Sequence, residues 1–380
     1  MSQSDFVRRM GSGGSAIYCG PSQWRRLHVD IPLLSLLLVL AIAGLFVLYS
    51  ASGQNTAYVH RQLVHYGIGL LVMLTVAQIP LRLLDRWAIL PYLSGVLLLI
   101  GVLFFGVGAK GAQRWLEIGG FRFQPSEILK IAIPLMLASY LGKRSVPPQF
   151  KHVFFALLFI LVPLVLVGMQ PDLGTAILIG AAGFFALFLA GLPRRYLIFA
   201  LLLAACLLPL MWFYLLYDYQ RQRILTLFNP EADRLGAGWN IIQSTIAIGS
   251  GGVDGKGWTL GTQSQLDFLP EGHTDFIIAV LAEEFGLFGV MLLMTLYLLI
   301  ISRCAFIGLR AQTMFGRLLA GSIALTFFVY IFVNMGMVSG ILPVVGVPLP
   351  LVSYGGTSIV TLMLGFGMLM AVSTERKRSI

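Results

Sequence analysis

The residues of this chain with the clearest chemical potential lie where polar sequence meets hydrophobic sequence. His273-Thr274-Asp275 ends the polar stretch 218–275 and directly precedes an apolar run that starts at Phe276. An ionisable carboxylate at the edge of a bilayer is costly, so it usually has a function. Held there by a long loop, Asp275 could accept a proton from a hydroxyl as a general base. The alternative is that Thr274 or Asp275 caps the helix that follows.

Other ionisable residues lie at the start of apolar runs or inside them. Glu127 and Lys130 are three residues apart and would share one helix face, either as a structural ion pair or as support for a catalytic group. Asp172 follows a proline and is expected either to cap a helix or to contact a substrate. Glu283 and Glu284 must face a polar cavity or a partner, for which an arginine on the cytoplasmic side is one candidate.

Cations also gather outside the apolar runs. Arg114, Arg221, Arg223 and Lys256 could hold a phosphate or a lipid headgroup, or they form a solvated surface. The glycine-rich run 249–252 lacks the lysine and the strand of a P-loop, so we do not expect nucleotide binding. No spacing of His or Cys indicates a metal site, although acids in a cavity could hold a divalent cation such as Mg or Mn.

The composition places these residues in a membrane protein. The mean hydropathy is +0.87, and only 11% of the residues are charged, against about 25% in a soluble domain. Ten apolar runs are long enough, or nearly long enough, to span a bilayer as helices, because backbone groups in lipid must be satisfied within the segment. They are 31–50, 63–79, 87–107, 124–142, 152–169, 173–192, 196–217, 276–301, 317–338 and 356–373. The predicted fold class is therefore an all-α integral membrane protein.

The distribution of Lys and Arg predicts the orientation. If the N-terminus is cytoplasmic and ten spans alternate, most of the 26 basic residues fall on the cytoplasmic side. These are Arg8, Arg9, Arg25, Arg26, Arg82, Arg86, Lys143, Arg144, Lys151, Arg194, Arg195, Arg303, Arg310, Arg317, Arg376, Lys377 and Arg378. The net charge of +10 then mostly reflects the membrane topology and does not indicate nucleic-acid binding.

This topology divides the chain into three parts. Residues 1–30 and 374–380 form cytoplasmic tails, and 31–373 forms one polytopic membrane domain with a large extracytoplasmic loop at 218–275, between the seventh and eighth helices. The fourth, sixth, eighth and tenth spans all begin on the extracytoplasmic side, so their positive helix N-termini face one layer and suit an anion. The tenth begins near Ser353 and Tyr354, which we expect to contact a substrate.

Six segments, taken in order, resemble the SEDS family (shape, elongation, division and sporulation). They are KGAQRW at 110–115, FQPSE at 123–127, QPDLGT at 170–175, YQRQRI at 219–224, HTDF at 273–276 and PLPLVSYGG at 348–356. The segment 337–348 is more similar to the rod-shape-determining branch of that family than to the division branch. The resemblance extends from about residue 30 to the C-terminus.

The resemblance implies a peptidoglycan glycosyltransferase of the bacterial inner membrane. It would polymerise lipid II, a disaccharide-pentapeptide on undecaprenyl pyrophosphate, during cell elongation. Its partners would be a class B penicillin-binding protein, the transpeptidase that crosslinks the strands, and other membrane proteins of the elongation complex. The essential aspartate of the family falls on Asp275, and its Glu/Lys pair falls on Glu127 and Lys130. We also expect a groove between spans, open sideways to the membrane, for the undecaprenyl tail.

Two other functions fit part of the pattern. Intramembrane charges such as Glu283 and Glu284 could form the proton path of a lipid II flippase. That reading requires functional charge at the cytoplasmic end too, where acids are few. A non-catalytic scaffold for the penicillin-binding protein is the third reading. Polymer formation from purified protein and lipid II in detergent separates all three, because no flipping is needed there.

Overall fold

The computed structural model describes residues 28–109, 112–118, 121–233, 236–266, 268–269 and 271–375. Most of both predicted tails, including Arg8, Arg9, Arg25 and Arg26, lies outside the described residues, as do Lys110 and Gly111. The rest is predominantly helical, and most of its core residues form one connected apolar cluster.

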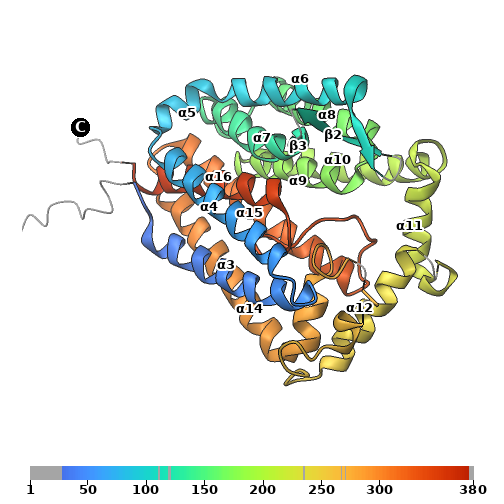
Figure 1. Cartoon of the computed structure of the whole chain (residues 1–380). Helices are drawn as coiled ribbons and strands as arrows, with labels where there is room; N and C mark the ends of the chain where they lie inside the picture. The colour runs from blue at the N-terminus through green and yellow to red at the C-terminus, as the bar shows by residue number, and fades with distance from the viewer. Residues whose placement is uncertain are drawn as a thin grey trace, which may run out of the picture.

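A helix covers each of the ten apolar runs. These helices are α3 (Ile31–Ala51), α4 (Thr56–Ala77), α6 (Ile89–Phe105), α7 (Pro125–Gly142), α8 (Phe150–Met169), α9 (Leu173–Leu189), α10 (Arg194–Leu210), α14 (Ile277–Arg310), α15 (Met314–Val338) and α16 (Gly356–Ser373). They are arranged side by side, with α15 and α16 near the middle of the bundle (Figure 1). The helical fold class is therefore confirmed for these runs.

Fewer than ten of the described helices meet the length and composition of a membrane span by themselves. Six do so, namely α3, α8, α10 with its extension to Tyr214, α14, α15 and α16. The count becomes seven if α4 and the short α5 (Leu81–Trp87), which meet at a bend of 100°, form one span. Helices α6 and α9 are apolar but only 17 residues long, and α7 contains Glu127 and Lys130.

The segment between α6 and α7 departs from the all-helical prediction. Strands β1 (Val107–Ala109), β2 (Ala112–Ile118) and β3 (Phe121–Phe123) form a small antiparallel sheet in the order β1-β2-β3. Two of the strands have three residues, which is too short for an alternating pattern to stand out in a sequence. The sheet packs on α6 and α7 and carries Arg114.

The predicted loop 218–275 is also more structured than expected. A π-helical turn η1 (Met211–Leu215) connects α10 to α11 (Asp218–Phe228), and η2 (Pro230–Asp233), α12 (Ala237–Gly251) and α13 (Thr262–Gln265) follow. Helices α11 and α12 lie at one side of the bundle, and α12 packs against α14 (Figure 1). The whole segment is polar compared with the spans, which is why the sequence showed it as a loop.

Helix α14 is broken near its start. Gly286 has φ 61° and ψ −157°, and a Cβ there would lie 2.4 Å from the Gly255 nitrogen, so only glycine fits. The backbone groups freed by the break pair with the adjacent loop, as in the bond from the Leu287 N–H to the Gly252 carbonyl (3.0 Å). Glu283 and Glu284 therefore lie at a helix break, whereas the sequence placed them within a continuous span.

A buried carboxylate ties three helices together at the opposite end of the bundle. Asp30 caps α3 by accepting from the Leu33 N–H (3.1 Å), and it accepts from Arg303 of α14 (2.8 and 3.0 Å) and from the Ser373 hydroxyl of α16 (2.5 Å). Burial of Asp30 by itself would raise its pKa, but the bonds from Arg303, Ser373 and Leu33 outweigh burial and lower it. The carboxylate therefore stays ionised and holds the three helix ends in place.

We expect Asp30→Ala to destabilise the protein in detergent by about 1–3 kcal/mol, because Arg303 loses its partner although it keeps some access to solvent. Thermal unfolding followed by size-exclusion chromatography measures this effect. Because the pKa is lowered, the stabilisation is present above the ordinary value of 3.8, so the difference from wild type should be constant from about pH 8 to 5.

The matched control is Lys143→Ala, which breaks the more exposed Lys143–Asp85 pair (3.0 Å, Lys143 side chain 58% exposed). Its expected cost is below about 1 kcal/mol. Equal losses from the two variants would contradict the role of the Asp30 clamp.

Candidate functional site

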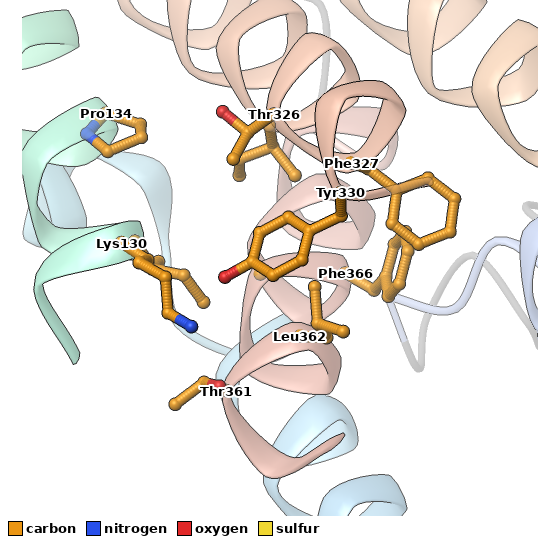
Figure 2. Close-up of a pocket in the computed structure, with 11 residues that line it drawn as sticks. Lys130, Pro134, Thr326, Phe327, Tyr330, Thr361, Leu362 and Phe366 are labelled. Atoms are coloured by element: carbon orange, nitrogen blue, oxygen red, sulfur yellow. The ribbon is translucent and has the colours of Figure 1, made fainter. Parts of the chain in front are cut away.

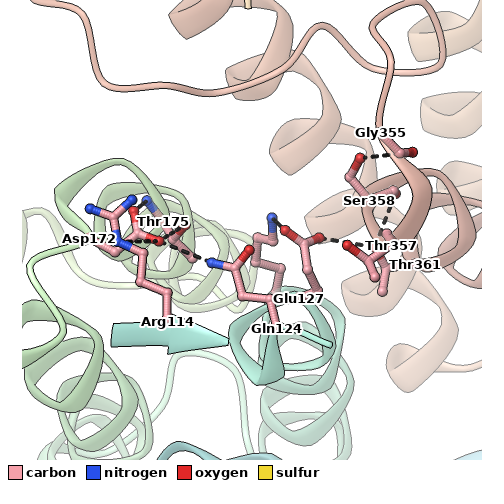
Figure 3. Close-up of polar contacts among 10 residues, drawn as sticks. Arg114, Gln124, Glu127, Asp172, Thr175, Gly355, Thr357, Ser358 and Thr361 are labelled. Carbon is pink, nitrogen blue, oxygen red and sulfur yellow. Dashed lines mark hydrogen bonds and ion pairs between the residues drawn. The ribbon is translucent and has the colours of Figure 1, made fainter. Parts of the chain in front are cut away.

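The N-termini of α7 and α9 meet through a short polar chain (Figure 3). The Gln124 amide donates to Asp172 Oδ2 (3.1 Å). Asp172 in turn caps α9, because it accepts from the Thr175 N–H (3.2 Å) and from the Thr175 hydroxyl (2.9 Å). The predicted cap is thus confirmed. Arg114 of β2 lies beside Asp172, with 3.9 Å between Nε and Oδ2, and donates to the carbonyls of residues 170 and 171.

Glu127 and Lys130 form the predicted ion pair inside α7. Lys130 Nζ is 2.6 Å from Glu127 Oε1, and each residue is only 6% exposed. The second carboxylate oxygen accepts from the Thr361 hydroxyl of α16 (3.1 Å), as Figure 3 shows. Lys130 Nζ also lies 5.0 Å from the centre of the Tyr330 ring on α15. The pair therefore connects three helices, and Tyr330 and Thr361 are partners that the sequence did not reveal.

A pocket of about 410 Å³ lies directly beside this pair, between α7, α15 and α16. Figure 2 shows Lys130 and Pro134 of α7 facing Tyr330 of α15, with Thr361 and Phe366 of α16 completing the lining. Its lining is mostly apolar with a few convergent polar groups, as is typical of a ligand site.

Asp275 lies at the junction of α14, α15 and the segment 339–355. Asn334 of α15 donates from one amide nitrogen to the Asp275 backbone carbonyl (2.8 Å) and to the Val347 carbonyl (2.7 Å). A Cβ on Gly346 would be 3.4 Å from Asp275 Oδ2, so the segment passes directly over the carboxylate. The N-cap of α14 is Phe276, whose side chain makes no capping bond. Neither Thr274 nor Asp275 therefore occupies the N-cap position itself.

The segment 339–355 is also attached to the turn before Asp275. The Tyr354 N–H donates to the His273 carbonyl (3.0 Å), and the Gln62 amide of α4 donates to the Ser353 carbonyl (3.0 Å). The Ser353 side chain is buried and accepts from the Leu349 N–H (2.8 Å), so it closes a turn of the backbone. Tyr354 is partly exposed, and its ring lies close to that of His273.

The four candidate cations lie in three different places. Arg114 and Arg223 line a second pocket, of about 440 Å³, together with Gln220 and the chain from Pro343 to Val345. Arg223 donates to the Val344 carbonyl (3.0 Å). Arg221 is directed elsewhere, to Asp218 (3.4 Å) and to the carbonyl of residue 213 (3.0 Å). The sequence could not separate Arg221 from Arg223, because it showed this segment as a loop. Helix α11 places the two side chains on different faces.

Lys256 pairs with Glu283 at the break in α14. Glu283 is fully buried and accepts from Lys256 Nζ (2.7 Å), the Thr262 hydroxyl (3.1 Å) and the N–H groups of Gln263 (3.0 Å) and Ser264 (3.3 Å). Its partner is thus a lysine of the polar segment and not a cytoplasmic arginine. Glu284 accepts from the Ser50 hydroxyl. These contacts attach α13 and the preceding loop to α14.

The donors of the site do not form a metal-binding set. Across the residues that the structure describes, no group of three or more His, Cys, Asp or Glu side chains is placed to hold a metal ion. Glu127 and Asp172, whose partners Lys130 and Arg114 line the two pockets, already accept bonds from protein donors.

Comparison with known proteins adds an independent view of this arrangement. A family model described as cell cycle protein, FTSW_RODA_SPOVE, matches residues 31–378. The chain is 54% identical over 354 residues to the peptidoglycan glycosyltransferase MrdB of Escherichia coli, covering 93% of this chain and 96% of the relative. It is 38% identical over 362 residues to the probable peptidoglycan glycosyltransferase FtsW of Geobacter sulfurreducens, covering 92% and 96%.

Two solved structures are similar as well. A chain from work on structural coordination of polymerization and crosslinking by a peptidoglycan synthase complex superposes with a TM-score of 0.80 at 33% identity, covering 92% of this chain and 99% of the other. The crystal structure of the rod shape determining protein RodA of Thermus thermophilus gives a TM-score of 0.69 at 29% identity, with coverages of 90% and 96%.

The buried pair in α7 predicts an asymmetric response to charge exchange. Glu127→Lys or Lys130→Glu alone should cost about 3–5 kcal/mol, because each leaves two buried like charges. The double variant restores opposite charges, but it loses the Thr361 bond to the carboxylate and the position of the cation beside Tyr330. We therefore expect the double variant to recover only part of the lost thermal stability in detergent. No recovery at all would show that the two residues act individually.

Proposed function

The chain belongs to the family of FtsW, RodA and SpoVE, also called the SEDS family, and we propose that this peptidoglycan glycosyltransferase polymerises lipid II with Asp275 as the general base. The observation that carries the proposal is the position of the Asp275 turn. It is tethered to the segment 339–355, in which Gly346 lies at the Asp275 carboxylate and directly follows Val345, a lining residue of the pocket with the two arginines. A base beside a cationic pocket suits a reaction in which a hydroxyl loses its proton while a pyrophosphate leaves.

The proposed reaction is a single displacement at the anomeric carbon of the donor. The oxygen of the acceptor sugar hydroxyl forms the new glycosidic bond as the bond from that carbon to the pyrophosphate oxygen breaks. The leaving pyrophosphate, still attached to its undecaprenyl chain, takes the electron pair, and the hydroxyl proton passes to an Asp275 carboxylate oxygen. Arg114 and Arg223 would stabilise the negative charge on the leaving group through charge-assisted hydrogen bonds.

The Glu127–Lys130 pair has a supporting role in this proposal. It sets the positions of α7, α15 and α16 around the 410 Å³ pocket. Apolar residues such as Pro134, Leu362 and Phe366 make this pocket suitable for the part of the undecaprenyl chain nearest the headgroup. Asp172 supports Arg114 rather than contacting the substrate, since its oxygens accept from Gln124 and Thr175.

The proposed setting is the bacterial inner membrane. We infer ten spans with both termini cytoplasmic, so that α7, α9, α14 and α16 begin on the extracytoplasmic side, where lipid II is polymerised. The bonds between the starts of α7 and α9, and between the Asp275 turn and Tyr354 just before α16, support this shared layer. Residues 31–373 would form the membrane domain, with short tails on either side.

A class B penicillin-binding protein is the proposed partner, together with other membrane proteins of the elongation complex. The similar chain from a peptidoglycan synthase complex, in which polymerization is coordinated with crosslinking, supports this assignment. The pairing of Glu283 with Lys256, together with three further hydrogen bonds, argues against a role for Glu283 in the proton path of the flippase alternative.

Replacement of Asp275 tests the general base. We expect purified Asp275→Asn or Asp275→Ala to lose polymerisation of lipid II by about 10²–10⁴-fold, the usual contribution of a positioned base. Glycan strands are resolved on gels from a reaction in detergent, and size-exclusion chromatography confirms folding. Asp254→Asn is the control, because Asp254 is an exposed acid of the same polar segment. Near-normal polymer from Asp275→Ala would rule out this role.

The two arginine groups predict different effects on the donor. Arg114→Gln and Arg223→Gln should each weaken binding of inorganic pyrophosphate, used as a competitive probe of polymerisation, by about tenfold or more, because each removes a charge-assisted bond. Arg221→Gln should change it little, since Arg221 is directed to Asp218. If all three variants retain wild-type inhibition by pyrophosphate, the pocket does not hold the leaving group.

A further inference from the structure

We infer that Tyr58, His273 and Tyr354 form a platform that binds the sugar ring of the acceptor, at the other end of the segment 343–354 from the arginine pocket. This inference rests on the proposed function, since it assigns one half of the same reaction site. It concerns the chemistry of the ligand, a pyranose ring, and not its phosphate or its lipid. The three residues are named below as the aromatic platform.

The rings of the platform come from three separate parts of the chain. Tyr58 lies in the first turn of α4, His273 in the turn before α14 and Tyr354 just before α16. Their centroids are 5.1 Å apart for Tyr58 and His273, 5.2 Å for Tyr58 and Tyr354, and 6.2 Å for His273 and Tyr354. All three residues are partly exposed, so the cluster presents aromatic surface at the outer ends of these helices.

The platform is held firmly relative to Asp275. His273 is two residues before Asp275, and its carbonyl accepts from the Tyr354 N–H (3.0 Å). Gln62, one turn after Tyr58 on α4, donates to the Ser353 carbonyl (3.0 Å). The platform and the candidate base therefore belong to one hydrogen-bonded unit, which links the backbone that carries the rings to the backbone of Asp275.

The segment 343–354 gives the order of the parts. Its first residues, Pro343 to Val345, line the pocket with Arg114 and Arg223. Gly346 follows at Asp275 Oδ2, and Tyr354 ends the segment at His273. From residue 343 to residue 354, the chain therefore passes first the cationic pocket, then the Asp275 carboxylate and last the aromatic platform. If the pocket takes the pyrophosphate of the donor, the saccharide whose hydroxyl meets Asp275 extends over the platform.

The chemistry of the platform fits a sugar. A pyranose has one face of C–H groups, which packs on the negative face of an aromatic ring, and polar edges, which the tyrosine hydroxyls and the imidazole can meet. Tyr58 and Tyr354 are edge to face at 80°, so one can offer its face while the other offers its hydroxyl edge. Aromatic rings of this kind add binding area at a low cost in side-chain entropy.

The platform is tested by comparing variants that lose an aromatic ring with a variant that keeps the ring. With purified full-length protein and lipid II in detergent, Tyr58→Leu and Tyr354→Leu should each raise KM about tenfold while kcat falls less than about threefold. Tyr58→Phe should recover most of the affinity that Tyr58→Leu loses. Inhibition by inorganic pyrophosphate should stay within about twofold of wild type in both leucine variants, because the arginine pocket is intact.

The control is Phe184→Leu, which removes an exposed ring that stacks on Phe188 in α9, away from the platform. If Tyr354→Leu does not fold, Tyr58→Leu carries the test, since Tyr58 lies in an end turn of α4. Wild-type KM in the leucine variants, with polymer still formed, would overturn the platform and leave the proposed function standing. Absence of polymer from the wild-type protein would overturn the proposed function itself.

Discussion

The ion pair between Glu127 and Lys130 is the interaction on which the arrangement of the site depends. Both charges are nearly buried, and in an apolar medium each would be costly alone. The pair reduces that cost, but the second carboxylate oxygen and the remaining ammonium hydrogens still require partners. Thr361 and the Tyr330 ring meet these requirements. Satisfying two charges therefore fixes α15 and α16 against α7, and this packing leaves a pocket beside the pair.

The same requirement explains the other polar contacts of the site. Asn334 is completely buried within α15, and its amide donates to two carbonyls, one of Asp275 and one of Val347. A buried amide without these acceptors would cost about 1–3 kcal/mol. The two hydrogen bonds therefore hold the Asp275 turn and the segment 339–355 against α15. At the break in α14, loop N–H groups and Lys256 satisfy Glu283 in the same way. Irregular backbone is tolerated here because backbone groups freed by the break, such as the Glu284 carbonyl and the Leu287 N–H, pair with the adjacent loop.

The sequence alone predicted the elements better than their partners. The helical runs, the cap at Asp172 and the pairing of Glu127 with Lys130 follow from periods and spacings within one segment, which a sequence shows directly. Thr361, Tyr330 and Asn334 lie inside apolar helices, and their roles depend on which helix faces them. A polar residue in an apolar run is a signal, but it does not identify its partner. The strands near Arg114 were missed because they are too short to show an alternating pattern, and the break at Gly286 because it depends on contact with the loop around Gly255.

Arg223 contacts the segment 339–355, whereas Arg221 does not, and this difference shows how the segment positions the parts of the site. The segment contains several prolines and glycines, and it has no secondary structure over most of its length. Its carbonyls therefore need donors, and Arg223 supplies one to Val344, Asn334 one to Val347 and Gln62 one to Ser353. Each donor comes from a different helix, so the segment is held along its whole course. A chain held in this way places a cationic pocket, Asp275 and the aromatic platform in a set order, which a transfer reaction between two bound saccharides requires.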